Sequence, residues 1–186
     1  MNRLSIPEPG LPEGFQPVGT FVVDTNVILV ANGQHEAVSP ACAACCARWL
    51  EGLMATGRVA LDDAYEILGE YQHKTHAGTG QGMGDRFVRW VLHHLDNPAR
   101  IDLVPLTPHA QRAYADFPDD ERLSHFDASD RKFVALSRAH PERPVIWQAA
   151  DCKWLDWAPA LAEHGVKVVL LCEPEMHEFH LHKFGV

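Results

Sequence analysis

The chain has 186 residues, of which 46% are hydrophobic, enough for one domain with a full core. Its formal net charge of −9 argues against a surface that binds DNA or RNA non-specifically. No apolar run approaches the roughly 18 residues of a membrane helix, and the N-terminus lacks the apolar stretch of a signal peptide, so we expect a cytoplasmic protein without membrane segments.

Strands and helices are predicted to alternate along the chain. In chain order we expect a Pro- and Gly-rich arm (1–18), a strand (20–24), a helix (39–56), a strand (58–63), helices (64–75 and 85–95), a strand (101–106), helices (108–116 and 130–140), a strand (143–151), a helix (156–164) and a strand (166–172). This order predicts an α/β fold, with helices on both faces of a mostly parallel sheet of about five strands. One domain over 19–174 and a His-rich tail over 175–186 follow.

Two segments carry residue types that often mark binding sites. The Gly-rich connector 78–84 lacks the Gly-Lys-Ser/Thr ending of a phosphate loop, so we expect only a flexible link. Cys42, Cys45 and Cys46 share one predicted helix, and five cysteines in total suit no closed disulfide framework. Buried reduced thiols are the favoured interpretation, and a metal or redox site is the alternative.

Asp24 interrupts the apolar string FVVDTNVILVAN at the end of the first predicted strand. An unpaired buried carboxylate costs several kcal/mol or takes up a proton, so its presence needs a reason. It either caps a turn or helps to hold a hard cation such as Mg²⁺.

Three further acids are expected near the same edge of the sheet as Asp24. Asp151 ends a later apolar strand, and the carboxyl ends of parallel strands meet at one edge. Asp130 begins the helix that feeds that strand, and Glu70 lies in the helix after the second strand. Clustered carboxylates repel one another unless divalent cations neutralise them, and oxygen-only ligands suit Mg²⁺ or Mn²⁺.

The strings DTN, ILGEY and DASDRKFVAL, followed by a strand that ends in Asp, together resemble the PIN-domain ribonucleases, over about residues 20 to 172. The resemblance implies a PIN-like α/β/α fold and a metal-dependent endoribonuclease. It also implies that Asp24, Glu70, Asp130 and Asp151 are the metal-binding and catalytic acids, with Mg²⁺ or Mn²⁺ as the cofactor.

The chain departs from the family pattern at the fourth acid. Lys153 stands where the family often has a further Asp, and Ala150 replaces the usual Gly before Asp151. Asp127 competes with Asp130 for the third role or serves as an outer ligand. Glu66 competes with Glu70 for the helical role, and the Tyr after Glu70 favours Glu70.

Other polar residues would support hydrolysis of RNA at such a site. Thr25 and Asn26 are expected to orient Asp24 or a water molecule. Positive charge for the RNA strand would come from residues that flank the connector and the motif helices: Lys74, His73, His76, Arg86, Arg89, Arg131 and Lys153. The acidic net charge favours short single-stranded or structured RNA in a cleft over duplex binding.

Alternative functions remain open at the level of the sequence. A phosphatase of the haloacid-dehalogenase type needs a second Asp where this chain has Asn26. Lys153 leaves open a PIN-fold scaffold or regulator without catalysis, although the four candidate acids count against it. Among active enzymes, a toxin of a toxin–antitoxin pair or a phage-defence or stress nuclease fits best, with an antitoxin or other regulatory protein and a second copy of the chain as partners. The tail, which includes His177, His180 and His182, is expected to be an edge strand or a docked segment, with a transition-metal site as the minor alternative.

Overall fold

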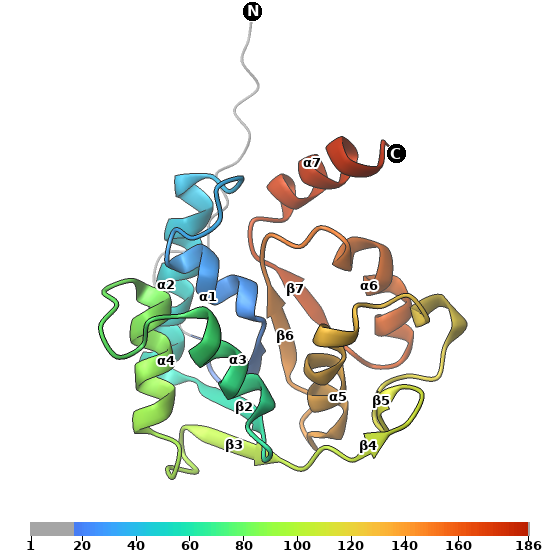
Figure 1. Ribbon diagram of the computed structural model, residues 1–186, viewed down its shortest axis with the longest axis horizontal. Coiled ribbons are helices and arrows are strands. Elements are labelled where there is room, and N and C mark those ends of the chain that lie inside the picture. Colours follow the sequence, from blue (N-terminus) through green and yellow to red (C-terminus); the bar gives the residue numbers. More distant parts are fainter. Residues whose placement is uncertain (1–16, 186) are drawn as a thin grey trace, which may run out of the picture.

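The computed structural model describes residues 17–185, and five parallel strands form one sheet in this part of the chain (Figure 1). The strand order is β3-β2-β1-β6-β7, which confirms the predicted α/β class. The strands are β1 (Thr20–Val23), β2 (Arg58–Asp62), β3 (Ile101–Val104), β6 (Val145–Gln148) and β7 (Val168–Leu170). The predicted arm lies outside the described residues up to residue 16.

Helices cover both faces of the sheet, as a three-layer α/β/α sandwich requires (Figure 1). One layer packs α1 against α2, α3 and α4, and the other places α5 over the central strands and α6 beside β7. The helices are α1 (Thr25–Ala31), α2 (Pro40–Thr56), α3 (Glu66–Lys74), α4 (Met83–His93), α5 (Arg131–Ala139), α6 (Trp154–Glu163) and α7 (Glu173–Phe184). No helix within residues 17–185 is long and apolar enough to span a membrane.

The order of the strands creates a crevice beside β1. The chain leaves β1 toward β2 on one side, whereas β6 pairs with β1 on the other, with Val23 opposite Trp147. In open parallel sheets, ligands bind outside the carboxyl ends of the strands where the order reverses in this way. The segments that follow β1 and β6 therefore meet at the place where a site is expected.

The Gly-rich connector is held by close packing and hydrogen bonds, which corrects the expectation of a flexible link. The Asp85 carboxylate accepts hydrogen bonds from the backbone N–H of His76 at 2.9 Å and from the side chain of Asn32 at 3.0 Å. A Cβ atom at Gly82 would lie 2.1 Å from Asn32 Oδ1, and one at Gly84 would lie 2.2 Å from the backbone oxygen of Ile28. These glycines are needed because α4 begins against the end of α1.

One predicted helix has a different structure. Residues 108–116, expected to be helical, contain the short antiparallel strands β4 (Pro108–His109) and β5 (Ala113–Tyr114). The turn between these strands is closed by the His109 ring, whose Nδ1 accepts the backbone N–H of Arg112 at 3.3 Å, and Ala113 has a φ of +68°, which no α-helix allows.

The C-terminal tail is the helix α7, so the prediction of an edge strand is wrong. Helix signals are present in the sequence, with Glu173 and Glu175 in the first turn and Gly185 as the C-cap at a φ of +70°. Its histidines do not converge: His180 Nε2 lies 2.8 Å from Asp156 Oδ1, and His177 lies 3.6 Å from Glu173. In the described part of the chain, they belong to no group of side chains that could share a metal ion.

A disulfide joins Cys42 of α2 to Cys172, the residue just before α7, so the prediction of reduced thiols is wrong for Cys42. The two residues are 130 positions apart in the chain, and no sequence spacing relates them. Cys45 and Cys46 are buried, as expected for small apolar groups. The disulfide attaches the C-terminal helix to the layer formed by α1 to α4.

Candidate metal centre

Asp24 occupies the end of β1 and caps α1 at the same time. Its backbone is extended, and its Oδ1 accepts the N–H of Asn26 at 2.8 Å. The residue is only 1% exposed. Among residues 17–185, the second carboxylate oxygen of Asp24 has no hydrogen-bond donor, so capping of α1 occupies only one of its two oxygens. Both sequence interpretations of Asp24, a cap and a ligand, are compatible with this geometry.

Three further acids come together from two segments. Asp127 precedes and Asp130 ends the short 3₁₀ turn η2 (Ala128–Asp130), and Asp151 lies in the turn after β6. One carboxylate oxygen from each of these three residues lies within 4.8 Å of the others. Ala150, which has a φ of +68°, turns the chain just before Asp151. The structure thus brings Asp127 into the same cluster as Asp130 and Asp151.

A cavity of about 290 Å³ lies beside Asp24 and Asp130. α1 contributes Thr25, Asn26 and Leu29 to its wall. α3 contributes Glu70 and Lys74, and η2 contributes Ser129. The predicted residues Thr25, Asn26, Glu70 and Lys74 therefore share one cavity with the two aspartates. We call this cavity, together with the Asp127–Asp130–Asp151 cluster, the acidic site.

The acidic site brings several negative charges close together around the buried Asp24. Burial, followed by the charges of Asp130, Glu70 and Asp151, raises the pKa of Asp24 well above its ordinary value, and the hydrogen bond from Asn26 only partly opposes this. Burial and the charges of Asp151, Asp127 and Glu70 raise the pKa of Asp130 to about 6. Close carboxylates in a low-dielectric site behave in this way when no cation separates them.

Glu70 is the acid of the site that already has a cationic partner. Lys132 Nζ lies 2.5 Å from Glu70 Oε2, and Thr25 Oγ1 donates to Glu70 Oε1 at 2.5 Å. Lys132 is only 8% exposed and also donates to the backbone oxygen of Ser129 at 2.6 Å. Lys132 was not among the residues expected at the site, because a lysine on an amphipathic helix is usually a solvated residue. Its position next to Phe133, in the apolar stripe of α5, was the available signal.

Lys153 closes the far end of the acidic site. Its Nζ lies 2.9 Å from Asp127 Oδ2, and its backbone N–H donates to Asp151 Oδ1 at 3.1 Å. A cation therefore contacts the acid cluster from the position where the family pattern often has a further Asp. Asp127 is bound to this lysine, whereas Asp130 and Asp151 have no ion pair within the described residues.

Other predicted residues lie away from the acidic site. Glu66 accepts a hydrogen bond from the Tyr114 hydroxyl at 2.6 Å, outside the cavity. The Arg131 guanidinium donates to the backbone oxygen of Ser124 at 3.0 Å and lies over the Phe117 ring, and Arg131 does not line the cavity. Arg86 and Arg89 line a different pocket, described below.

Tyr71 supports the site from α3, a role that its sequence position alone does not indicate. Its hydroxyl donates to the backbone oxygen of Val23, the residue just before Asp24. Tyr71 is completely buried, and burial together with the charges of Asp24 and Glu70 raises the pKa of its hydroxyl. The neutral hydroxyl thus fixes the end of β1 and, with it, the position of Asp24.

The donor set fits a hard divalent cation. The main donors are carboxylate oxygens from Asp24, Asp130 and Asp151. These groups repel one another, which raises the pKa of Asp24 and of Asp130, and a bound cation would offset this repulsion. No cysteine or histidine lines the cavity or belongs to the cluster. This chemistry suits Mg²⁺ or Mn²⁺ better than Zn²⁺.

The chain matches no protein-family model, and comparisons with curated proteins and with solved structures also find no match. What the site does is therefore inferred from its side chains and from their arrangement at the crevice.

Proposed function

We propose that the protein is a Mg²⁺- or Mn²⁺-dependent endoribonuclease, of the kind found in PIN-domain proteins. The observation that carries the proposal is the buried Asp24, surrounded by the charges of Asp130, Glu70 and Asp151 at the carboxyl ends of the parallel strands. A structural role does not explain this concentration of like charge, because repulsion between the carboxylates lowers the free energy of unfolding.

The acids of the site have different tasks in the proposed reaction. Asp24, Asp130 and Asp151 would hold the metal ion. A bound divalent ion would lower the pKa of a water molecule and offset charge on phosphate oxygens during hydrolysis. Glu70, fixed by Lys132 and Thr25, would position the attacking water by accepting its hydrogen bond. Lys74, which is exposed at the wall of the cavity, would bind a neighbouring phosphate.

RNA is the proposed substrate because the acidic chain is unsuited to broad duplex binding and the cavity is small. We place the enzyme in the cytoplasm with its RNA, as a toxin, phage-defence or stress nuclease restrained by an antitoxin or other regulatory protein, and with a second copy of the chain as a further partner.

A second candidate function is supported by the two lysines of the site. Lys132 is paired with Glu70, and Lys153 with Asp127, so internal cations offset part of the negative charge. A PIN-like protein that neutralises its site in this way could act as a scaffold or regulator through a protein partner. This function predicts an intact fold, no cleavage of RNA, and weak binding of divalent ions.

The decisive experiment is a cleavage assay on mixed single-stranded RNAs with Mg²⁺ or Mn²⁺, paired with calorimetric titration of each metal. We expect cleavage by the wild type that EDTA abolishes, and a loss of at least about a hundredfold in Asp24→Asn and Asp151→Asn. Asp63→Asn is the matched control, because Asp63 is exposed beside β2 and its side chain has no hydrogen bond or ion pair among the described residues. Equal cleavage by wild type and Asp24→Asn would overturn the assignment of the site, and metal-independent cleavage would overturn the proposed chemistry.

A further inference from the structure

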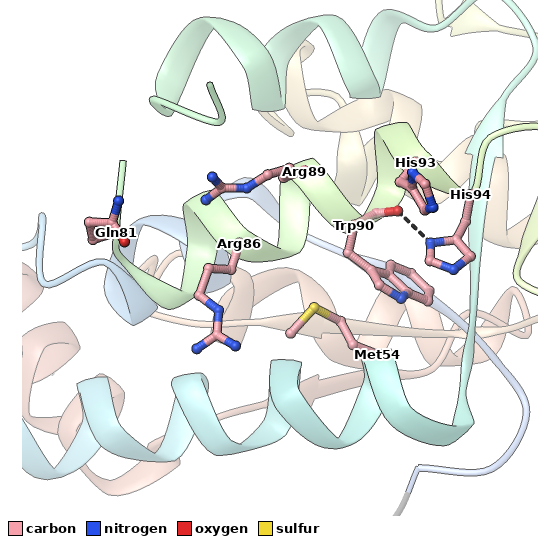
Figure 2. Close-up of a pocket in the computed structure, with 7 residues that line it drawn as sticks. All are labelled: Met54, Gln81, Arg86, Arg89, Trp90, His93 and His94. Atoms are coloured by element: carbon pink, nitrogen blue, oxygen red, sulfur yellow. Dashed lines mark hydrogen bonds between the residues drawn. The ribbon is translucent and has the colours of Figure 1, made fainter. Parts of the chain in front are cut away.

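A second pocket, separate from the acidic site, lies along α4 and faces α2 (Figure 2). Its volume is about 550 Å³, which falls within the range of pockets that hold small organic ligands. Arg86, Arg89, Trp90 and His93 come from α4, His94 follows that helix, and Met54 comes from α2. We call it the α4 pocket.

Positive charge and aromatic surface are combined in the α4 pocket. Two guanidinium groups and two imidazole rings line it, and none of its described lining residues is acidic. This is notable in a chain whose formal net charge is −9. Guanidinium groups bind phosphate through parallel N–H donors, and flat aromatic rings offer stacking surface to nucleic-acid bases.

The cationic groups of the α4 pocket retain donors for a ligand. The Arg86 side chain extends toward α2 in Figure 2 and has no hydrogen bond or ion pair within residues 17–185. Arg89 uses Nη2 on the backbone oxygen of Gly80 at 2.9 Å, and this bond holds its guanidinium beside the connector. Among residues 17–185 no acid pairs with either arginine, so both retain donors for an anion.

The aromatic wall is ordered by contacts within the protein. His94 Nδ1 lies 2.8 Å from the backbone oxygen of Trp90, and because a carbonyl only accepts, Nδ1 carries the proton (Figure 2). His94 Nε2 therefore remains to accept a hydrogen bond from a ligand hydroxyl or amine. The centroid of the His94 ring also lies 4.7 Å from that of the Trp90 ring and 5.1 Å from that of the His93 ring. The base of a bound nucleotide would therefore contact rings that the protein already holds in place.

The α4 pocket is connected to the acidic site by a rigid element. Asp24 caps one end of α1, and Asn32 at the other end exchanges hydrogen bonds with Asp85 of α4, at 3.0 and 3.1 Å. α1 has seven residues and spans about 10 Å at the usual rise per residue, and the pocket residues Arg86 to His94 follow Asp85 over up to about 14 Å of α4. A single RNA strand of several nucleotides is long enough to follow this path.

From these features we infer that the α4 pocket binds one nucleotide of a single-stranded RNA whose scissile phosphate lies in the acidic site. The inference rests on the proposed ribonuclease function. Arg86 binds the phosphate of that nucleotide, Arg89 binds a neighbouring phosphate of the same strand, and the Trp90–His93–His94 wall contacts the base. An acidic peptide would satisfy the arginines but would make little use of the three rings, so RNA is the better match.

The test measures binding of a fluorescein-labelled single-stranded RNA of about 12 nucleotides by fluorescence anisotropy, with EDTA present to prevent cleavage. The double variant Arg86→Ala/Arg89→Ala should raise the Kd at least about tenfold and reduce the dependence of log Kd on log salt by about two. His93→Ala, at an exposed position, should raise the Kd about fivefold. The matched control is Lys167→Ala/Lys183→Ala, which removes two exposed charges elsewhere and should change the Kd less than the arginine pair does.

Failure of this inference can be distinguished from failure of the proposed function. If the arginine pair leaves the Kd unchanged while Asp24→Asn still abolishes cleavage, the α4 pocket is not an RNA site and the nuclease assignment stands. If RNA binds in an arginine-dependent way but no metal supports cleavage, the pocket assignment stands and the nuclease assignment fails. Competition by poly-glutamate that equals competition by unlabelled RNA would overturn the inference in favour of a protein partner.

Discussion

Asp24 and Asp62 lie at the carboxyl ends of two neighbouring parallel strands, and each is only 1% exposed. Asp62 uses both of its oxygens within the fold, because Oδ2 accepts the N–H of Glu66 at 2.7 Å and Oδ1 that of Ile67 at 2.9 Å. Asp24 accepts one N–H, from Asn26, and faces the charges of Asp130, Glu70 and Asp151.

Asp62 is a buried acid whose two oxygens both stabilise the fold through hydrogen bonds, whereas Asp24 is a buried acid with one oxygen left for a ligand. Burial and position in the sheet are the same for Asp62 and Asp24. Only the number of hydrogen-bond donors and the neighbouring charges differ. A carboxylate with unused acceptor capacity among other carboxylates is therefore a better indicator of a metal site than burial at a strand end.

The largest effect on stability is expected for Asp62→Ala. Loss of two hydrogen bonds from backbone N–H groups to a buried carboxylate should lower the free energy of unfolding by about 3 kcal/mol. Urea denaturation with EDTA present measures this value, and Asp63→Ala at the exposed neighbouring position should change it by less than about 0.5 kcal/mol. If Asp24→Asn lowers stability as much as Asp62→Ala does, the two aspartates do not differ in the way described.

An intermediate effect is expected for the buried pair of Lys132 and Glu70. Lys132→Met leaves the Glu70 charge without its cation, and we expect a loss of about 2 kcal/mol in the free energy of unfolding. Glu70→Gln in the same chain should restore much of this loss, and a double-mutant cycle measures the coupling. A coupling close to zero would mean that the lysine does not stabilise Glu70.

A smaller effect, of opposite sign, is expected for Asp24→Asn in the metal-free protein. Removal of one charge from the acidic site should raise the free energy of unfolding at pH 7 by about 1 kcal/mol. In the wild type, folding raises the pKa of Asp24 and that of Asp130, the latter to about 6. The folded state therefore binds protons more tightly than the unfolded state. The stability contributed by Asp130 is complete below about pH 4 and is lost as the pH rises through about 6, and the stability contributed by Asp24 is likewise lost as the pH rises.

Thermal unfolding at several pH values, with EDTA or with Mg²⁺, tests this prediction. Mg²⁺ should raise the Tm of the wild type near neutral pH and should have little effect on Asp24→Asn. An Asp24→Asn protein that is less stable than the wild type at pH 7 in EDTA would contradict the view that the site stores unfavourable charge.

The smallest effect is expected for Glu66→Gln, the competitor of Glu70 on α3. Glu66 contacts the Tyr114 hydroxyl outside the cavity, so its loss should change the free energy of unfolding by less than about 0.5 kcal/mol and leave RNA cleavage within about twofold. Glu70→Gln should reduce cleavage at least about tenfold. Similar cleavage by the two variants would remove Glu70 from the proposed site.

Much of the fold was predictable because local signals and periodicity agree. Ser39 and Pro40 begin α2, and Gly57 ends it, as capping chemistry predicts. The five strands follow apolar runs that suit a parallel sheet buried on both faces. The prediction failed at 108–116, where helix propensity is weak, and in the tail, where alternating histidines suggest a strand although an acidic first turn and Gly185 favour a helix.

The sequence by itself determined the α/β class, the position of Asp24 after a buried strand, and the acids that stand near the other strand ends. These depend on residues close together in the chain, where periodicity and capping act. Only the tertiary structure decided that Asp62 is fully bonded and Asp24 is not, that Lys132 and Lys153 contact two of the acids, and that Cys42 meets Cys172. These facts depend on contacts between segments distant in the chain, and such contacts follow from the packing of the whole domain rather than from any local pattern.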